Sequence, residues 1–399
     1  MSARERWPAA TARRRQFAVV CLHTLIFQAA IFLLRPTASY RAIEFGVPSS
    51  WLGFLAASFA MVPLLVALPA GDAADRWGEN RVLLLGAVVV ATGGALFFFG
   101  GHNFTALVMA TIVLGTGHLL CTIGQQAMVA NLIPQGRLNS AFGYYTFAGS
   151  LGQAAGPGLL GLFGGNGSLP RTDDAFLAAT IVSVLLVVVT LFARGTPRGH
   201  QTTRVADRKV VSLLRMPGLV RALLVSGMVL ASMDITLVYL PALGAEEGLS
   251  VGVVGGLLTA RALASMVSRL FMGGMVSLIG RRALLVSSIV AAGVATAVIA
   301  APVHLVVAFL AVAIMGGGLG VCQPLTLSWL TEIAPPGLRG RVMSFRLVAN
   351  RFGQVVIPSG VGLVAAGLGA VGVFWLTAVA LVGAAHTARS VPMDSPNRK

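Results

Sequence analysis

Charged residues are scarce in this 399-residue chain. Asp, Glu, Lys and Arg together make up 11% of it, whereas apolar residues make up 56% and the mean hydropathy is +0.85. A soluble domain averages about 25% charged residues, so this chain has too little polar surface to cover a water-exposed globule. The shortage excludes an ordinary soluble protein and predicts a chain whose main solvent is hydrocarbon.

Cysteine is also rare, and none of the three residues is placed for a disulfide or a metal site. Cys21, Cys121 and Cys322 lie far apart, each inside an apolar run. This placement excludes a disulfide framework and predicts no metal centre. The sequence shows neither a nucleotide-binding P-loop nor a metal-ligand cluster. We therefore expect no cofactor and no coupling to ATP within this chain.

The net charge of +16 raises nucleic-acid binding as a function class. A nucleic-acid surface gathers its basic residues on one face of a folded domain. Here the basic residues stand in short segments between apolar runs, which is where membrane topology requires them. We therefore expect the partner to be the lipid bilayer and not a nucleic acid.

Twelve apolar runs are long enough to cross a bilayer, which takes roughly twenty residues. The arginine-rich N-terminus before the first run also fits a signal peptide. However, the run is long enough to span, no small-residue cleavage site follows it, and Arg35-Pro36 closes it, which favours an uncleaved helix. The sequence thus predicts an all-α integral membrane protein of twelve transmembrane helices. The runs lie near 17–35, 51–70, 82–100, 104–132, 141–163, 175–193, 219–243, 251–276, 283–301, 303–330, 342–366 and 369–388.

Basic residues concentrate on one side of the predicted bundle. The N-terminal tail, every second loop, the middle loop and the C-terminus hold most of them, whereas the opposite loops hold only Arg41 and Arg171, with Arg35 at a helix end. Positive charge marks the cytoplasmic side, so both termini are expected there. The richness in Ala, Gly and Arg is typical of a GC-rich bacterial genome, and we expect the bacterial cytoplasmic (inner) membrane.

The second half of the chain repeats the first. Gly and Pro residues recur at an offset of 201 or 202 positions, as Gly115 and Gly316 or Gly78 and Gly280 show. The repeat predicts two pseudo-symmetric six-helix halves, at residues 1–200 and 219–399, with 201–218 in the middle loop. Repeats of this kind place a substrate path at their interface near mid-membrane. Further matches are Gly53 with Gly255, Cys121 with Cys322, Pro157 with Pro358, and Gly152-Gln153 with Gly353-Gln354.

The segment 71–78, after the second run, reads G-D-A-A-D-R-W-G. It resembles the signature loop G-x-x-x-D-R-x-G of the major facilitator superfamily, and the helix count and the repeat extend this resemblance over nearly the whole chain. The resemblance implies a conformational latch in which an acid faces the N-terminus of a helix in the other half, near Arg341 to Arg346. A solvated loop with incidental charges is the alternative. The implied latch residues are Gly71, Asp75, Arg76 and Gly78.

The fifth run resembles the glycine-rich motif of the antiporter, exporting branch of that family. Its spacing is G-x8-G-x3-G-P-x2-(G)-G, with Leu160 in place of one glycine. Small residues let helices approach closely, and proline permits a kink. The resemblance implies a helix that bends or seals between the halves, whereas plain close packing is the alternative. The motif residues are Gly143, Gly152, Gly156, Pro157 and Gly161.

Of the thirteen acids, only Asp234 lies well inside an apolar run. A mid-membrane charge costs roughly 2.5–3.5 kcal/mol on insertion scales, so it usually has a partner or a task. Arg261 and Arg351 are expected at similar depth, judged from the helical rise. We therefore predict that Asp234 carries a proton, with Arg261 or Arg351 as its alternating counter-ion. A fixed ion pair that only joins two helices is the alternative, and His118 is the rival proton site.

Other polar and aromatic residues in the apolar runs are candidates for the wall of a substrate cavity. Interhelical hydrogen bonds or ordinary packing would explain the same residues. The candidates are Gln28, Phe32, Gln354 and Tyr239.

The resemblance implies a secondary active transporter that works by alternating access, without enzymatic activity and as a monomer. We expect proton-coupled efflux of small amphipathic organic molecules, such as a drug or a secondary metabolite of the siderophore type. One alternative is an uptake permease for a small organic anion, held by Arg261 and Arg351. A membrane sensor or an intramembrane enzyme is the other.

Overall fold

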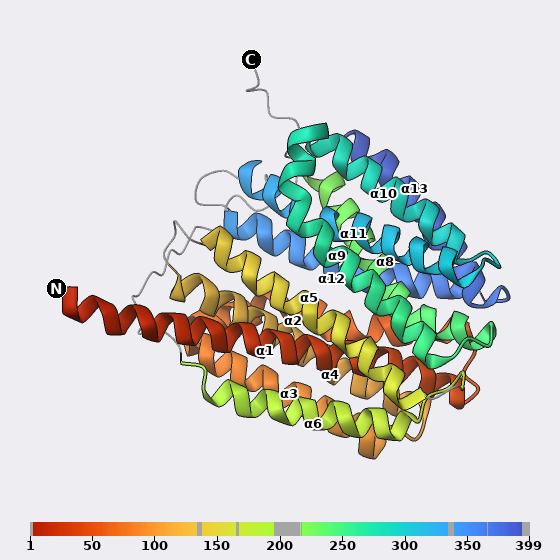
Figure 1. The fold of residues 1–399 in the computed structure, drawn as a ribbon, viewed down its shortest axis with the longest axis horizontal. Coiled ribbons are helices and arrows are strands. Elements are labelled where there is room, and N and C mark those ends of the chain that lie inside the picture. Colours follow the sequence, from red (N-terminus) through yellow and green to blue (C-terminus); the bar gives the residue numbers. More distant parts are fainter. Residues whose placement is uncertain are drawn as a thin grey trace.

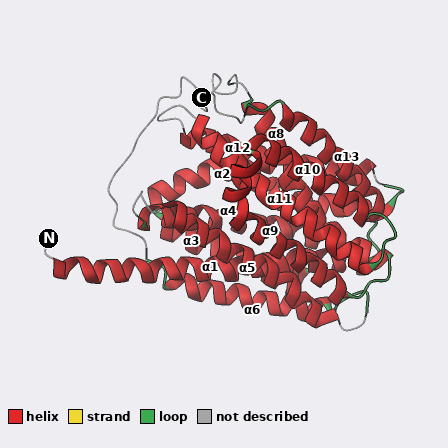
Figure 2. Cartoon of the chain, turned by 45° about the horizontal axis from the view of Figure 1, so that its top comes forward, coloured by secondary structure: helices red, strands yellow, loops and turns green. Residues whose placement is uncertain are grey.

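The computed structural model is entirely helical over the residues that it describes, which are 3–133, 138–164, 167–194, 216, 218–333, 339–364 and 366–392. Twelve helices and no strand lie in this part of the chain (Figures 1 and 2). They are α1 (Ala3–Glu44), α2 (Ser49–Trp77), α3 (Glu79–Gly100), α4 (Phe104–Leu132), α5 (Leu138–Gly164), α6 (Thr172–Leu191), α8 (Leu219–Glu246), α9 (Val251–Ile279), α10 (Arg281–Ile299), α11 (Leu305–Ile333), α12 (Arg339–Val364) and α13 (Gly369–Arg389).

Eleven of these twelve helices are long and apolar enough to cross a membrane. The exception among the described helices is α5, which is rich in glycine and alanine. It packs against both α1 and α9. A helix covered on two sides by other helices needs less apolar surface than one that faces lipid, so its composition is compatible with a span.

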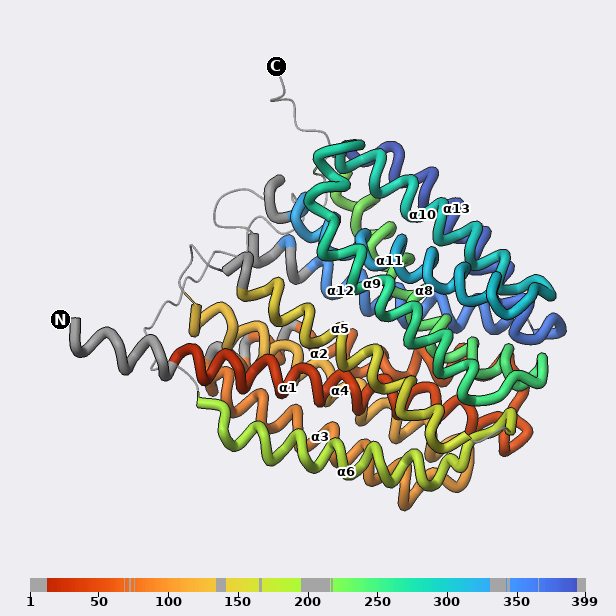
Figure 3. The backbone as a smooth tube through the Cα atoms, viewed as in Figure 1, coloured from red at the N-terminus to blue at the C-terminus, as the bar shows by residue number. Residues whose placement is uncertain are grey.

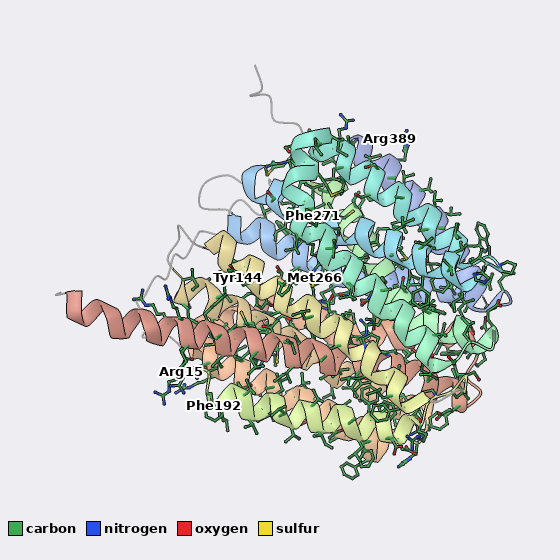
Figure 4. All side chains as sticks on the ribbon, viewed as in Figure 1. Arg15, Tyr144, Phe192, Met266, Phe271 and Arg389 are labelled. Carbon is green, nitrogen blue, oxygen red and sulfur yellow. The ribbon has the colours of Figure 1, made fainter. Side chains whose placement is uncertain are left out.

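Large apolar side chains cover the outside of the bundle. Leu278, Leu65 and Phe99 are 83%, 77% and 72% exposed, and Figure 4 shows side chains projecting outward along the helices. A soluble monomer rarely exposes so much contiguous apolar surface, whereas a lipid-facing helix must. The described part therefore confirms a multi-pass membrane protein.

Two helix ends differ from the sequence prediction. The first helix does not stop at Arg35-Pro36 but continues to Glu44, and the second continues through the predicted loop to Trp77. Proline is tolerated inside membrane helices because neighbouring groups satisfy the freed backbone carbonyl. Arg35 therefore lies inside a helix and not at its end.

The turns between helices repeat at an offset of 202 residues. Gly46 and Gly248 both have φ +69°, and Gly78 and Gly280 have φ +94° and +82°. These backbone angles favour glycine, since other residues place a β-carbon against the chain. The first pair of turns defines what we call the Gly46 end of the bundle, and the second pair defines the Gly78 end. Arg15 and Arg389, labelled in Figure 4, belong to the helices α1 and α13 that reach the Gly78 end.

Helices α1 to α6 form one half and α8 to α13 the other, side by side (Figure 1). Helix α2 packs on α12 and α5 packs on α9 across the interface. The two contacts are equivalent: Gly53 lies against the carbonyl of Pro358, and Gly255 lies against that of Pro157. The predicted pseudo-symmetry of the halves is thus confirmed, whereas the boundaries at 200 and 219 stay a prediction because 195–215 lies outside the described residues.

The halves converge toward the Gly46 end, as the tube in Figure 3 shows. There the Ser49 hydroxyl donates to Glu246 Oε1 at 2.6 Å, and the Val251 amide donates to the Gly167 carbonyl at 3.0 Å. The Glu246 carboxylate also accepts from the Ala370 amide at the start of α13. In this conformation hydrogen bonds between the halves hold the Gly46 end together.

Replacing Gly115 by Ala should lower the free energy of unfolding by about 1–3 kcal/mol, the usual cost of overpacking. A β-carbon there would overlap the carbonyl of Phe59 on α2. Gly383 on α13 has nothing within 4 Å of a β-carbon position, so Gly383→Ala should be neutral or gain up to about 1 kcal/mol from helix propensity. Unfolding of both purified variants in detergent checks this, and equal stabilities would contradict the packing.

Candidate substrate and proton site

A buried ion pair joins the two halves in the middle of the bundle. Arg35 Nη1 on α1 lies 2.5 Å from Asp234 Oδ1 on α8. The two residues are only 5% and 8% exposed. In so dry a site a guanidinium and a carboxylate attract one another much more strongly than in water. The pair therefore ties α1 to α8 across the interface of the halves.

The second oxygen of Asp234 is also occupied. The side-chain amide of Gln354 on α12 donates to Asp234 Oδ2. Gln354 Oε1 in turn accepts from Arg351 Nη1 at 3.0 Å, and Arg351 Nη2 lies 3.4 Å from His118 Nδ1 on α4. Because a guanidinium can only donate, His118 Nδ1 acts as the acceptor. One polar chain thus runs from α4 through α12 and α8 to α1.

Aromatic rings enclose this chain on the side of the first half. The Arg35 guanidinium carbon lies 4.3 Å from the ring centroid of Phe59, within the range of a cation–π interaction. The His118 ring lies 5.1 Å from the rings of both Phe59 and Phe27. These rings exclude water from one flank of the ion pair and hold Arg35 in place.

The partner of Asp234 differs from the predicted one. Arg351 reaches Asp234 only through Gln354, and Arg261 makes no hydrogen bond to it in this conformation. The direct partner is Arg35, which the sequence prediction had assigned to a helix end because Pro36 follows it. The signal that could have revealed Arg35 is its offset of 199 residues from Asp234, within one helical turn of the repeat. The alternation between Arg261 and Arg351 stays a prediction.

Arg261 lies on α9 at the same level and is only 2% exposed. Its charge interacts with those of Asp234 and Arg35. No hydrogen bond or ion pair of its side chain is found among the described residues, and its Nε is buried without an acceptor. By the repeat, Arg261 stands where the first half has Phe59, since Gly316 packs on its backbone as Gly115 packs on that of Phe59.

The other residues that the sequence predicts for the cavity wall differ in their surroundings. Gln28 on α1 has a buried Oε1 that accepts no hydrogen bond from the described residues. Phe32 is half-buried and packs against the core. Tyr239 is fully buried and its hydroxyl faces Gly53 on α2 and Gly362 on α12, at the contact between these helices. The structure therefore brings Gln354 into the chain around Asp234, whereas the role of Gln28, Phe32 and Tyr239 in a substrate cavity stays a prediction.

The glycine motif of α5 lies where that helix meets both halves. Gly152 and Gly156 approach the backbone of α1, Pro157 contacts Gly255, and Gly161 lies near Gly252 on α9. Gly143 differs, because nothing lies within 4 Å of its β-carbon position. Close packing explains four of the five positions, and the motif's role in transport stays a prediction.

The predicted latch lies in the last two turns of α2 and not in a loop. Gly78 is the turn residue, Arg76 is exposed, and Gly71 has open space around it. The side chain of Asp75 lies outside the described residues, as does that of Arg341 in the expected partner segment, Arg341 to Arg346. Arg346 donates to the carbonyl and the side chain of Gln323. The latch contact itself stays a prediction.

Replacing Arg35 by Gln should destabilise the protein by about 3–5 kcal/mol, since it leaves Asp234 buried without its cation. Asp234→Asn should likewise destabilise the protein, since it leaves Arg35 buried without its anion. The double variant should lose less than the sum of the two, with a coupling of about 1–3 kcal/mol. Unfolding of the four proteins in detergent measures this cycle, and strictly additive losses would show that the pair contributes nothing.

Comparison with known proteins agrees with this architecture. The sequence profile of the Major Facilitator Superfamily matches residues 20–256 and 222–398, nearly the whole chain. The solved structure of the nucleoside transporter NupG superposes with a TM-score of 0.77 at 15% identity, and the match covers 95% of this chain and 98% of that one. At that identity the likeness concerns the fold alone.

Curated relatives match a shorter stretch. The quinolone resistance protein NorA of Staphylococcus aureus is 24% identical over 147 residues, which is 37% of this chain and 38% of NorA. Multidrug resistance protein 2 of Bacillus subtilis is 27% identical over 144 residues, 36% of this chain and 34% of that protein. The chain thus spans less than two fifths of the length of each of these relatives. With two related helical halves in the described part and a family match over almost its full length, the chain belongs to the Major Facilitator Superfamily of transporters.

Proposed function

We propose that this transporter couples proton movement to the export of small amphipathic organic molecules, and that Asp234 is the proton site. The Arg35–Asp234 ion pair between the halves carries this proposal. Within the described transmembrane helices, Asp234 is the acid buried at mid-length, paired with Arg35 and linked to Arg351 through Gln354. A group that gains and loses a proton at the interface of the halves is placed to link protonation to their relative movement.

The physical link is the charge on Asp234. When the carboxylate is ionised, Arg35 and Gln354 hold it and α1 stays tied to α8. A proton on Asp234 removes the negative charge, and the attraction that holds Arg35 is lost. Separation of the halves at this point, which alternating access requires, then becomes easier. Arg261 or Arg351 serves as the counter-ion after the halves have moved.

The free energies of the ion pair and of proton movement fit such a mechanism. Breaking a buried ion pair by losing one partner costs about 3–5 kcal/mol, which is enough to keep the ionised carrier in one conformation. A proton crossing a membrane potential of about 100 mV releases about 2.3 kcal/mol. One or two protons per cycle therefore supply energy of the same order as the barrier that the ion pair sets.

Export is supported by the relatives and by α5. The names of NorA and of the Bacillus protein refer to resistance against quinolones and multiple drugs. The glycine motif of α5 resembles that of exporters and lies between α1 and α9. Gln28, with its free side-chain oxygen, and the half-buried Phe32 supply one polar and one apolar contact on α1 for an amphipathic molecule.

We further propose that the Gly78 end faces the cytoplasm of a bacterial inner membrane, with both termini on that side. Basic residues at helix ends support this orientation, because Arg76, Arg281 and Arg389 belong to the Gly78 end and positive charge favours the cytoplasmic side. The Asp75 latch would then close the cytoplasmic side when the Gly46 end opens. The chain would act as a monomer, since each monomer holds a complete Asp234 site.

Uptake of a small organic anion is the second candidate function. Arg261 favours it, because this buried guanidinium has no anionic partner among the described residues. The solved structure of a nucleoside transporter, which has the same fold, shows that the fold does not select a drug exporter.

Energised inside-out vesicles should lose part of their pH gradient when a transported amphipathic compound is added. Asp234→Asn should abolish this proton release, because an amide cannot bind the proton, whereas Asp234→Glu should retain at least part of it. Glu247→Gln, which removes an exposed acid just after the same helix, serves as the matched control and should behave like wild type. A pH-sensitive fluorescent dye measures the gradient.

Two results would contradict the proposal. Full proton release in Asp234→Asn would exclude Asp234 as the proton site and would bring His118 forward. A gradient that no compound disturbs, even in the wild type, would exclude export of that set of compounds. Accumulation of a labelled organic anion by intact cells would then support the uptake permease.

A further inference from the structure

The interior of the described bundle contains far more positive than negative charge. Asp234 is the one acid at this depth, and both of its oxygens are already bound, by Arg35 and Gln354. Four further arginines lie in the second half without an ion pair in the described part of the chain. They are Arg261 and Arg269 on α9 and Arg346 and Arg351 on α12.

Three of these four arginines donate only to neutral groups. Arg351 reaches Gln354 and His118, Arg269 reaches the Gly320 carbonyl and the Ser150 hydroxyl, and Arg346 reaches Gln323. Arg261 has no acceptor at all among the described residues, although it is almost completely buried. A buried cation without an anion of its own costs several kcal/mol, and the one acid whose charge Arg261 feels, Asp234, is already held by Arg35 and Gln354. The missing component of this site is therefore an anion.

The face of α9 that carries Arg261 continues toward the Gly78 end. Arg261, Ser265 and Arg269 are spaced four residues apart, which puts them on one side of the helix over a rise of roughly 12 Å. The Ser265 hydroxyl is buried against Gly320 on α11 and makes no hydrogen bond among the described residues. A guanidinium, a hydroxyl and a second guanidinium thus form a polar stripe from the Gly78 end to the level of Asp234.

A guanidinium matches the planar anionic groups of organic acids. It binds carboxylate and phosphate oxygens through two parallel N–H donors, and it stays charged under all relevant conditions. The Nε atoms of both Arg261 and Arg351 are buried and free of acceptors. Each arginine therefore keeps a donor that no group among the described residues uses.

We propose that the transported molecule is an amphipathic organic anion whose charged group binds Arg261. This proposal rests on the proposed function, in that the chain moves a small organic molecule past Asp234. Arg269, with Arg346 at the corresponding level of α12, attracts the anion from the Gly78 end. Arg351 neutralises the charge of the anion when it reaches the level of Asp234.

The first test compares matched probes on the purified protein in a neutral detergent free of anionic lipid. Naphthalene-2-carboxylate, naphthalene-2-sulfonate and 2-naphthyl phosphate share one ring system, and neutral naphthalene-2-carboxamide is their control. At least one of the anions should raise the melting temperature of the wild type with increasing concentration, as ligand binding to the native state requires. The carboxamide should not.

Arg261→Gln should remove this rise or shift it to at least tenfold higher concentration, whereas Arg282→Gln, at the exposed Gly78 end, should keep it. The ligand-free protein gives a second readout. Arg261→Met should melt at a higher temperature than wild type, by about 2 °C or more, because it removes an unpaired buried charge. If a group of the protein paired with Arg261, Arg261→Met would instead melt at a lower temperature than wild type.

Three results would overturn the proposal: no rise with any of the three anions, an equal rise with the carboxamide, or an undiminished rise in Arg261→Gln. A fall in the melting temperature of ligand-free Arg261→Met would do the same. The measurement needs no proton gradient. Binding without proton release would therefore contradict only the proposed function, and proton release by neutral compounds without anion binding would contradict only this inference.

Discussion

The cost of placing charge in hydrocarbon governs the centre of this molecule. Asp234 and Arg35 lie on different halves, yet neither is stable there without the other, since each would be a lone buried ion. Their pairing fixes how α1 and α8 meet. The positions of Gln354 and Phe59 then follow, because one satisfies the second carboxylate oxygen and the other covers the guanidinium. A change at this pair is therefore transmitted to the relative position of the halves through direct contacts.

The two halves share their backbone contacts but not their chemistry. Gly115 and Gly316 pack on equivalent residues, Phe59 and Arg261, and Gly53 and Gly255 both pack on the carbonyl of a proline. Glycine is needed at these positions in both copies because the helices approach too closely for a side chain. The residues that face the centre are free of that constraint. As a result the first half supplies rings and Arg35, and the second supplies the acid and the unpaired arginines.

The sequence predicts the architecture well and the partner of Asp234 poorly, for physical reasons. Helix number and the repeat follow from apolar runs and glycines, which depend only on local composition and on close packing. Asp234 is recognisable because charge is rare in such runs. The sequence does not reveal Arg35, because the residue before a proline usually ends a helix, whereas α1 continues through Pro36 to Glu44. The free Nε of Arg261 depends on every neighbouring helix at once, so no spacing rule could give it.

The charge of the substrate and the direction of transport are linked through Asp234. A proton on this carboxylate raises the positive charge of a site already rich in arginine, so it strengthens the binding of an anion and weakens that of a cation. Ligands that bind together tend to cross together, whereas ligands that exclude one another are exchanged. A cationic drug would compete with the proton and be exported in exchange for it. An organic acid would instead bind with the proton and move in the same direction. The unpaired Arg261 weighs toward the second case. A zwitterion satisfies both, since its anionic group can occupy Arg261 while its cation competes with the proton near Asp234.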